Sequence, residues 1–352
     1  MILRTIRKNV HMASMLLPLV GLAASAQTGT PFVVTASNNA TANQLLVYTP
    51  TGNLIQSIPT EGKGGASGNG GGLQTSNGLV AVVNFGSNSV SIFQAAGGLF
   101  LTQVIPTVTA PVSVAFSATH LYILGAQKVE SHLIFGNLVA PTADGSSTLL
   151  VADGSAAQVG VLTSQIIVTE KSNVIETFNL LASGAVSGAA TSIPGVPAFT
   201  PGNPASNEPF GLVTRGNDAY VTIAHDNAVD LVRNNAILTP GSTNNFTAAQ
   251  TAPCWATLTG PFLYTSNTAS QTLSRFAVYG QHIVNDAAVV ATFPGNPTDN
   301  ASGEGLVAAI DGINNLSHLS IFTRDEDGNL TTSAVIVIPG TINGVAVVPN
   351  PL

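Results

Sequence analysis

The chain has little charge of either sign and very few basic residues. Only 8% of its 352 residues are charged, against about a quarter in an average soluble protein. Its 10 Lys and Arg are outnumbered by 17 Asp and Glu, and they form no stripe or patch along the sequence. Nucleic acids and anionic membrane surfaces are bound through clustered cationic side chains. The composition therefore argues against both as partners.

Cysteine is nearly absent as well. Cys254 is the only one, so no intrachain disulfide can form. A chain of this length buries enough apolar surface to fold without one. We expect Cys254 to be a buried packing residue, because no base is evident in the sequence that would activate it as a nucleophile.

The N-terminus has the three parts of a secretory signal peptide. Arg4, Arg7 and Lys8 precede an apolar stretch at residues 12–24, and small residues follow up to Ala26. The apolar stretch is shorter than the roughly 20 residues that span a bilayer, which speaks against the alternative of a membrane anchor. We therefore expect residues 1–26 to be removed and the mature protein to be secreted or periplasmic.

One phrase returns seven times: an apolar strand, a short turn rich in Asn, Gly and Ser, and a second apolar strand. Its clearest copy is residues 79–93, and successive copies start 41 to 53 residues apart. The other copies begin near Phe32, His120, Gln165, Asp218, Phe262 and Leu306. This period, with four strands expected per unit (72–75, 79–84, 89–94 and 100–105 in the clearest one), is typical of a β-propeller.

The two ends of the chain predict how the ring closes. Three strands at residues 32–37, 44–50 and 54–60 lack an innermost strand, and a single strand at 344–349 has nothing after it. Together they complete one blade, so we expect an all-β, seven-bladed propeller forming a single domain over residues 27–352. In the last repeat, residues 301–305 are the expected innermost strand, and residues 194–209 are expected to form an exposed loop.

Residues 85–93 and 319–330 resemble the repeats of seven-bladed lactonase-like and YVTN-type propellers, and the resemblance covers the whole mature chain. That group includes proteins similar to 6-phosphogluconolactonase and to carboxymuconate-cyclising enzymes, and also secreted members of unknown activity. Lactonase-like members often carry a Pro-His pair where the chain enters the innermost strand. Here the residues after the matching prolines are Val112, Phe210 and Cys254, which departs from that pattern.

Strand direction predicts where functional residues gather. Because the strands of a blade alternate in direction, the connection into the first strand and the turn between the second and third share one face. Opening a ring ester needs a base for the attacking water and a cation or dipole for the oxyanion. We expect Glu208, Glu304 and His225 to supply acid–base groups on this face. Five further residues are expected to bind ligand there: Lys128, Lys171, Asp226, Trp255 and Asn343.

Each candidate also has a purely structural interpretation. Glu208 and Glu304 could be solvated acids in loops. His225 and Asp226 could form a polar turn, and Trp255 could be a packing residue. The acidic turn at residues 325–329 lacks the rest of a calcium loop, and the histidines show no zinc spacing. We expect neither a metal nor another cofactor.

Two functions remain open on the sequence. The first is a non-catalytic scaffold that binds a small polar molecule, a glycan or a protein at the mouth of the central channel. The second is a lactonase-like hydrolase or cyclising enzyme that acts on a small unphosphorylated ring ester. The lack of the family's histidines and of cationic residues favours the binding scaffold, but the fold supports both.

Overall fold

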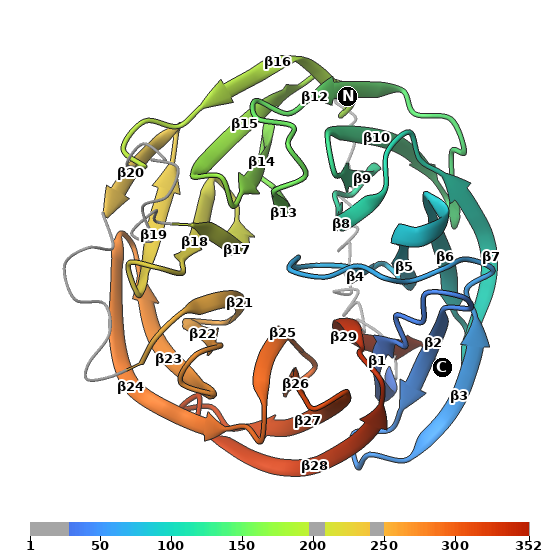
Figure 1. The fold of residues 1–352 in the computed structure, drawn as a ribbon, viewed down its shortest axis with the longest axis vertical. Helices are drawn as coiled ribbons and strands as arrows, with labels where there is room; N and C mark the ends of the chain where they lie inside the picture. The colour runs from blue at the N-terminus through green and yellow to red at the C-terminus, as the bar shows by residue number, and fades with distance from the viewer. Residues whose placement is uncertain (1–27, 197–207, 240–249, 352) are drawn as a thin grey trace, which may run out of the picture.

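The computed structural model describes residues 28–196, 208–239 and 250–351. The predicted signal peptide lies outside these residues, as do residues 197–207 of the predicted loop at 194–209. The described residues form seven antiparallel sheets arranged as blades around an axis (Figure 1). None of them forms a helix with the length and hydrophobicity that a membrane span requires.

In blades 2 to 7 the strands follow one another in the chain from the axis outward. In blade 1 the innermost strand is the last strand of the chain. The first four blades, in order around the ring, contain the following strands: β29 (Asn343–Pro351), β1 (Thr28–Ala36), β2 (Gln44–Tyr48) and β3 (Leu54–Pro59); β4 (Leu73–Ser76), β5 (Leu79–Asn84), β6 (Ser89–Ala95) and β7 (Leu99–Pro106); β8 (Pro111–Phe116), β9 (His120–Gly125), β10 (Lys128–Phe135), β11 (Leu138–Val139) and β12 (Gly145–Thr148); β13 (Ala156–Val161), β14 (Gln165–Glu170), β15 (Val174–Leu180) and β16 (Val186–Ser192). In blade 3 the outermost position is shared by β11 and β12, which both pair with β10.

The remaining three blades have four strands each. They contain β17 (Pro209–Arg215), β18 (Asp218–Ile223), β19 (Ala228–Arg233) and β20 (Ala236–Thr239); β21 (Pro253–Thr259), β22 (Phe262–Asn267), β23 (Thr272–Tyr279) and β24 (His282–Thr292); β25 (Asn296–Gly303), β26 (Leu306–Ile313), β27 (Leu316–Arg324) and β28 (Leu330–Pro339). From the apolar runs of the repeat, the second strands of blades 2, 3, 4 and 6 are predicted at residues 79–84, 120–125, 165–170 and 262–267, and β5, β9, β14 and β22 have these bounds.

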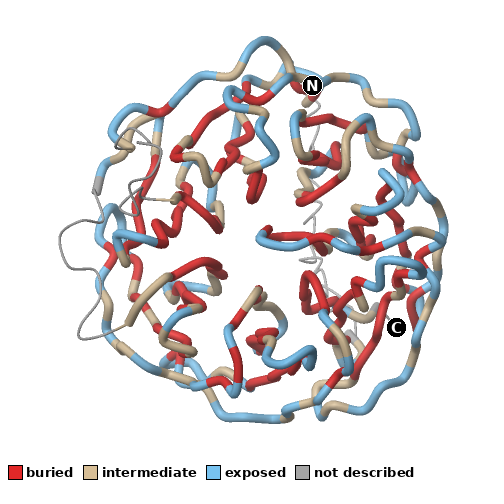
Figure 2. Tube along the Cα trace, in the orientation of Figure 1, coloured by how far each residue is buried: buried red, intermediate tan, exposed pale blue. Residues whose placement is uncertain are grey.

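The hydrophobic core lies between blades rather than at one centre. Strand β5 is buried at all six positions, because neighbouring blades pack against both faces of its sheet. Val80 and Val82 of this strand pack with Val34 and Leu45 of blade 1, for example. Figure 2 shows that buried residues concentrate in the inner strands, while exposed residues follow the outermost strands.

The predicted ring closure is confirmed. Strand β29, from the C-terminus, pairs antiparallel with β1, from the N-terminal part of the described chain, with Val34 opposite Ala346. The hydroxyl of Thr35 also donates a hydrogen bond to the carbonyl of Gly344, at 2.7 Å. Backbone pairing therefore completes blade 1 and leaves the ring without an open inner edge.

The prediction for the innermost strand of blade 7 is wrong. That strand is β25, Asn296–Gly303, and not residues 301–305. It escaped the apolar pattern because its buried positions include Asp299 and Asn300, whose side chains hydrogen-bond instead of packing. Glu304 and Gly305 both have positive φ, of 49° and 76°, and form the turn into β26.

A glycine-rich connection crosses the middle of the ring. Residues 61–72, here named the axial loop, join β3 to β4, and seven of these twelve residues are glycine. Figure 1 shows the chain before β4 reaching the middle of the ring. The nitrogen of Gly70 donates to the carbonyl of Ala157 in blade 4, at 3.0 Å. Asn69 accepts a hydrogen bond from Trp255 of blade 6 and donates one to Val112 of blade 3.

The loop has to be glycine-rich because it passes so close to its neighbours. A Cβ on Gly70 would lie 2.4 Å from the Oε1 of Gln158, and one on Gly64 would lie 2.3 Å from the carbonyl carbon of Asn38. Gly68 and Gly71 adopt left-handed φ values of 61° and 64°, which glycine reaches without steric cost.

Candidate functional site

The ring has two different faces. The upper face carries the connections into the innermost strands and the turns between second and third strands. The lower face carries the turns between first and second and between third and fourth strands. Glu304, in the turn from β25 to β26, lies on the lower face. The expectation that it shares a face with Glu208 and His225 is therefore wrong, because the innermost strand of blade 7 was placed too far along the chain.

Glu208 and His225 are brought together as predicted for the upper face. Glu208 immediately precedes β17, and His225 lies in the turn between β18 and β19 of the same blade. The Nε2 of His225 is 2.8 Å from the Oε2 of Glu208, and the two side chains are 42% and 26% exposed. The backbone holds this geometry, because the carbonyl of Glu208 accepts the amide of Ala224 at 3.1 Å.

Lys171 joins this pair from the neighbouring blade. It follows β14, and its ammonium donates to the carbonyl of Gly68 in the axial loop. The same nitrogen lies 5.4 Å from the centroid of the Phe210 ring, within the range of a cation–π contact. Burial lowers the pKa of Lys171, and the carboxylates of Glu208 and Asp153 act against that shift. Glu208, His225 and Lys171 are named the upper cluster below.

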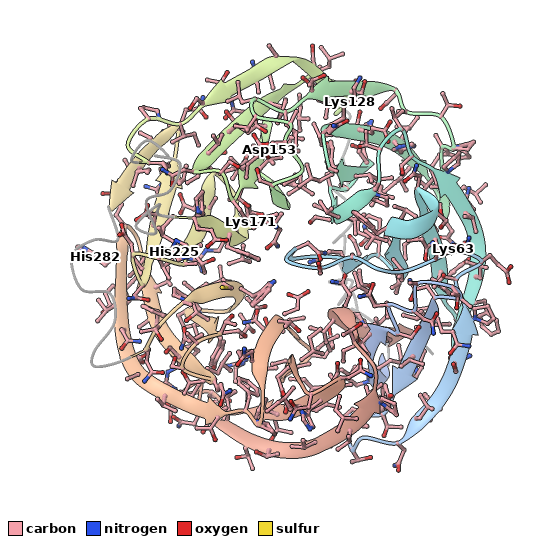
Figure 3. The ribbon with its side chains drawn as sticks, viewed as in Figure 1. Lys63, Lys128, Asp153, Lys171, His225 and His282 are labelled. Atoms are coloured by element: carbon pink, nitrogen blue, oxygen red, sulfur yellow. The ribbon has the colours of Figure 1, made fainter. Side chains whose placement is uncertain are left out.

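Figure 3 labels Lys171 and His225 on neighbouring blades, with Lys128 farther round the ring and toward its rim. Lys128 begins β10, the third strand of blade 3, and is partly exposed. Asp226 is exposed in the turn that carries His225. The structure therefore keeps Lys128 apart from the upper cluster and places Asp226 beside it in the chain.

Two of the predicted ligand-binding residues are already engaged by the protein. Trp255 is 5% exposed, and its indole N–H donates to the carbonyl of Asn69 at 2.9 Å. Its ring meets Phe210 edge-on, with 5.0 Å between centroids. The amide of Asn343 donates to the Oδ1 of Asn69, also at 2.9 Å. Both side chains therefore hold the axial loop in place.

Cys254 is buried, as expected for a packing residue. Burial raises the pKa of its thiol to about 11, and the nearby carboxylate of Glu208 acts in the same direction. A thiol with this pKa stays protonated near neutral pH, so it is a poor nucleophile.

Blade 4 contains two buried carboxyl groups that sequence reasoning did not identify as structural. Glu170, the last residue of β14, accepts the backbone amides of Val151 and Ala152, each at 3.1 Å. Glu176, in β15, accepts the amide of Leu150 at 3.0 Å. Burial, reinforced by the charge of Glu170, raises the pKa of Glu176 to about 8. Both residues hold the connection that leads into blade 4.

Asp299 plays a comparable part at the axis. It is buried, and its Oδ1 accepts the backbone amide of Asn300 at 2.8 Å. The backbone amides of Gly71, in the axial loop, and Val345, in blade 1, also favour its ionised form. Burial raises its pKa to about 7 against these donors. The described residues contain no group of three or more His, Cys, Asp or Glu side chains placed to hold a metal ion.

The axial loop also determines which end of the channel is open. Its contacts with five blades close the axis beneath the upper face. Below it, two adjoining cavities of about 200 Å³ and about 230 Å³ lie between the lower halves of the innermost strands. The upper cluster therefore lies on one side of the axial loop, and these two cavities lie on the other side. The run of glycines at residues 61–72 was the available sequence signal for this arrangement.

Comparisons with known proteins support the fold. No family model matches the chain, and no curated protein matches it significantly. Among solved structures, it is similar to a candidate 6-phosphogluconolactonase from Bacteroides fragilis, with a TM-score of 0.62 and 17% identity over 92% of this chain and 99% of that one. A protein from Lactobacillus plantarum gives a TM-score of 0.64 and 15% identity, with coverages of 91% and 99%.

A virginiamycin B lyase from Staphylococcus aureus is also similar, with a TM-score of 0.50 and 14% identity over 80% of this chain and 91% of that one. At these identities the similarity establishes the architecture alone. The predicted seven-bladed β-propeller fold is confirmed.

Proposed function

We propose that this chain is an exported, ligand-binding β-propeller that holds a small polar molecule at the upper cluster. The observation that carries the proposal is the 2.8 Å contact between His225 and Glu208, with the ammonium of Lys171 held nearby. Together these side chains offer an acceptor, an imidazole and a cation to one ligand. The signal-peptide pattern of residues 1–26 supports export.

Binding is favoured over catalysis by the surroundings of the cluster. Side chains that are 42% and 26% exposed lie in a high-dielectric environment, where electrostatic stabilisation of a transition state is weak. The axial loop closes the channel below, so a ligand would rest on the face instead of entering a water-excluded cavity. A binding site requires only complementary hydrogen-bonding groups, and the cluster supplies them.

The second candidate is a lactonase-like hydrolase, and one observation favours it specifically. An imidazole hydrogen-bonded to a carboxylate is the arrangement of a general base, and Lys171 is a cation that would stabilise an oxyanion. Two of the similar solved structures are named as enzymes, a candidate 6-phosphogluconolactonase and a virginiamycin B lyase, and these names are compatible with an enzyme that acts on a small molecule. The scarcity of cations makes an unphosphorylated ring ester the better substrate.

The experiment that separates the two uses a panel of unphosphorylated lactones with their hydroxy acids and neutral oligosaccharides. The ring resonances of His225 are followed by NMR as each compound is added, and acid release is followed at constant pH. We expect saturable shifts of His225 with at least one compound, weakened roughly tenfold in Glu208→Gln, and no acid release.

Two outcomes overturn the binding proposal. Hydrolysis that falls by about 100-fold or more in Glu208→Gln would establish the enzyme instead. Unchanged His225 resonances across the whole panel would remove the upper cluster as a site for small polar molecules. Lys128→Gln is the matched control, since this residue lies on the same face but in blade 3.

A further inference from the structure

The lower part of the central channel is a pocket with one closed end. Its walls are the lower halves of innermost strands β4, β8, β13 and β17 in one cavity, and of β4, β13, β17, β21, β25 and β29 in the adjoining one. The axial loop and Asp299 close the upper end, as described above. Each of these innermost strands is hydrogen-bonded to the second strand of its own blade. The walls are therefore fixed by the fold, and the pocket is formed before any ligand binds.

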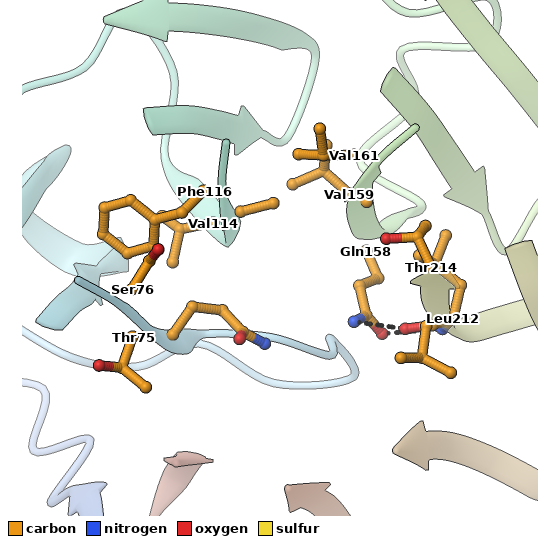
Figure 4. A pocket seen from close by; sticks show the side chains of 13 residues that line it. Thr75, Ser76, Val114, Phe116, Gln158, Val159, Val161, Leu212 and Thr214 are labelled. Atoms are coloured by element: carbon orange, nitrogen blue, oxygen red, sulfur yellow. Dashed lines mark hydrogen bonds between the residues drawn. The ribbon is translucent and has the colours of Figure 1, made fainter. Parts of the chain in front are cut away.

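The lining alternates hydrogen-bonding and aliphatic side chains. Figure 4 shows Thr75, Ser76 and Val114 on one side of the first cavity and Gln158, Leu212 and Thr214 on the other. The amide of Gln158 is held in place by Leu212, because it both donates to and accepts from the backbone of that residue, at 2.9 and 3.0 Å.

Other polar groups of the wall remain available to a ligand. Within the described part of the chain, the side chains of Gln74 and Thr214 have no protein hydrogen-bond partner, and both border the cavity. Thr257 and Ser302, in the wall of the second cavity, share a hydrogen bond of 2.8 Å. Thr75 donates to the carbonyl of Leu79 at 2.9 Å and keeps its acceptor lone pairs.

The described residues give the wall no cation, and its one carboxylate is already hydrogen-bonded to the protein. No Lys, Arg or His from the described residues borders either cavity. The single carboxylate, Asp299, already accepts the backbone amide of Asn300, and the amides of Gly71 and Val345 also favour its ionised form. A charged ligand would lose its hydration without gaining a counter-ion, which is costly, whereas hydroxyls and amides would find partners.

We propose that this lower channel pocket binds an uncharged, hydroxyl-rich molecule of about one sugar ring. Cavities of about 200 Å³ and about 230 Å³ are smaller than the roughly 300–1,000 Å³ typical of drug-sized ligands. The aliphatic positions would contact the ring faces, and Gln74 and Thr214 would hydrogen-bond its hydroxyls. This site is separate from the upper cluster, from which the axial loop divides it.

The test compares three probes of nearly equal size and different charge. Glucose, glucuronate and glucosamine, which share the same ring, are titrated separately, and binding is measured by saturation-transfer NMR and by shifts of the Thr214 amide. We expect glucose to bind at least tenfold more tightly than either charged probe. Gln74→Leu and Thr214→Val remove a hydrogen-bonding group while keeping side-chain size, and each is expected to weaken glucose binding about tenfold.

Glu326→Gln is the control, and it should leave glucose binding unchanged because Glu326 is exposed in a turn and borders neither cavity. Thermal unfolding of each variant checks that the fold is retained. Equal binding of all three probes, glucose binding that both channel variants leave intact, or no binding of glucose up to about 50 mM would each overturn the proposal. None of these results would bear on the upper cluster, whose test is the His225 resonance.

Discussion

At the scale of single residues, the carboxyl groups of this protein divide into structural and available ones. Glu170, Glu176 and Asp299 are buried and accept backbone amides, so they hold connections between strands. Glu208 instead reaches a partly exposed imidazole on the upper face. Burial therefore separates the structural carboxyl groups from those that a ligand can reach, and the sequence around each residue does not.

The raised pKa of Glu176 predicts a particular pH dependence of stability. Between the unfolded value of 4.5 and the folded value of about 8, the folded state keeps a proton that the unfolded state has lost. Wild-type stability should therefore fall as the pH rises through this window, by on the order of 1 kcal/mol per pH unit. Glu176→Gln removes this contribution, so the free energy of unfolding of the variant should rise relative to that of wild type from pH 5 to pH 8.

Urea unfolding of both proteins at several pH values measures this difference. Glu326→Gln is the matched control, because Glu326 is exposed in a turn and should follow wild type throughout. A constant difference between Glu176→Gln and wild type across the window would show that the carboxyl of Glu176 is ionised in the folded state.

At the scale of elements, the axial loop takes a path that is unusual for a connection. Such a long connection without strands is expected on the surface, yet residues 61–72 cross the axis. Their polar backbone groups are satisfied by Ala157 and Lys171 from blade 4 and by Trp255 from blade 6, which meets the requirement that buried amides and carbonyls be paired.

A methyl group on Gly70 tests the packing of this loop. Its Cβ would lie 2.4 Å from the Oε1 of Gln158 and 3.1 Å from the ring of Trp255. Gln158 cannot move away without breaking its hydrogen bonds to Leu212. Gly70→Ala should therefore lower the free energy of unfolding by about 1–3 kcal/mol, measured by urea unfolding.

Gly98→Ala is the control for that experiment. The nearest atoms to its added Cβ lie at 3.5 Å, in Gln56, so stability should stay the same or rise slightly. Equal stability of the two variants would mean that the axial loop can shift to admit a side chain, and that it does not close the channel tightly.

Predictions from the sequence succeeded where the repeat is regular. The second strands of blades 2, 3, 4 and 6 were placed to the residue, because apolar runs bounded by turn residues mark fully buried strands. The innermost strand of blade 7 was misplaced because Asp299 and Asn300 break the apolar pattern. The Glu208–His225 pair was assigned to one face from strand direction alone, whereas the contact of Lys171 with the axial loop depends on a path that no local pattern encodes.

At the scale of the whole molecule, two kinds of interaction hold the ring together. The backbone of β29 pairs with β1, and side chains near the axis bridge neighbouring blades. Gln158 joins blade 4 to blade 5, Thr222 donates to carbonyls in blades 5 and 6, and Asn300 reaches blade 6. The axial loop completes this inner set of contacts and divides the axis into an upper face with the charged cluster and a lower, uncharged pocket.

That division is the central claim, and amide hydrogen exchange across residues 61–72 tests it most directly without any ligand. The amides of Gly64, Gly65 and Gly70 donate to the carbonyls of Asn39, Asn38 and Ala157. We predict that the peptide containing them exchanges at least about 100-fold more slowly than an unstructured peptide of the same sequence. Exchange at the unstructured rate would contradict the account, because the channel would then be open from face to face.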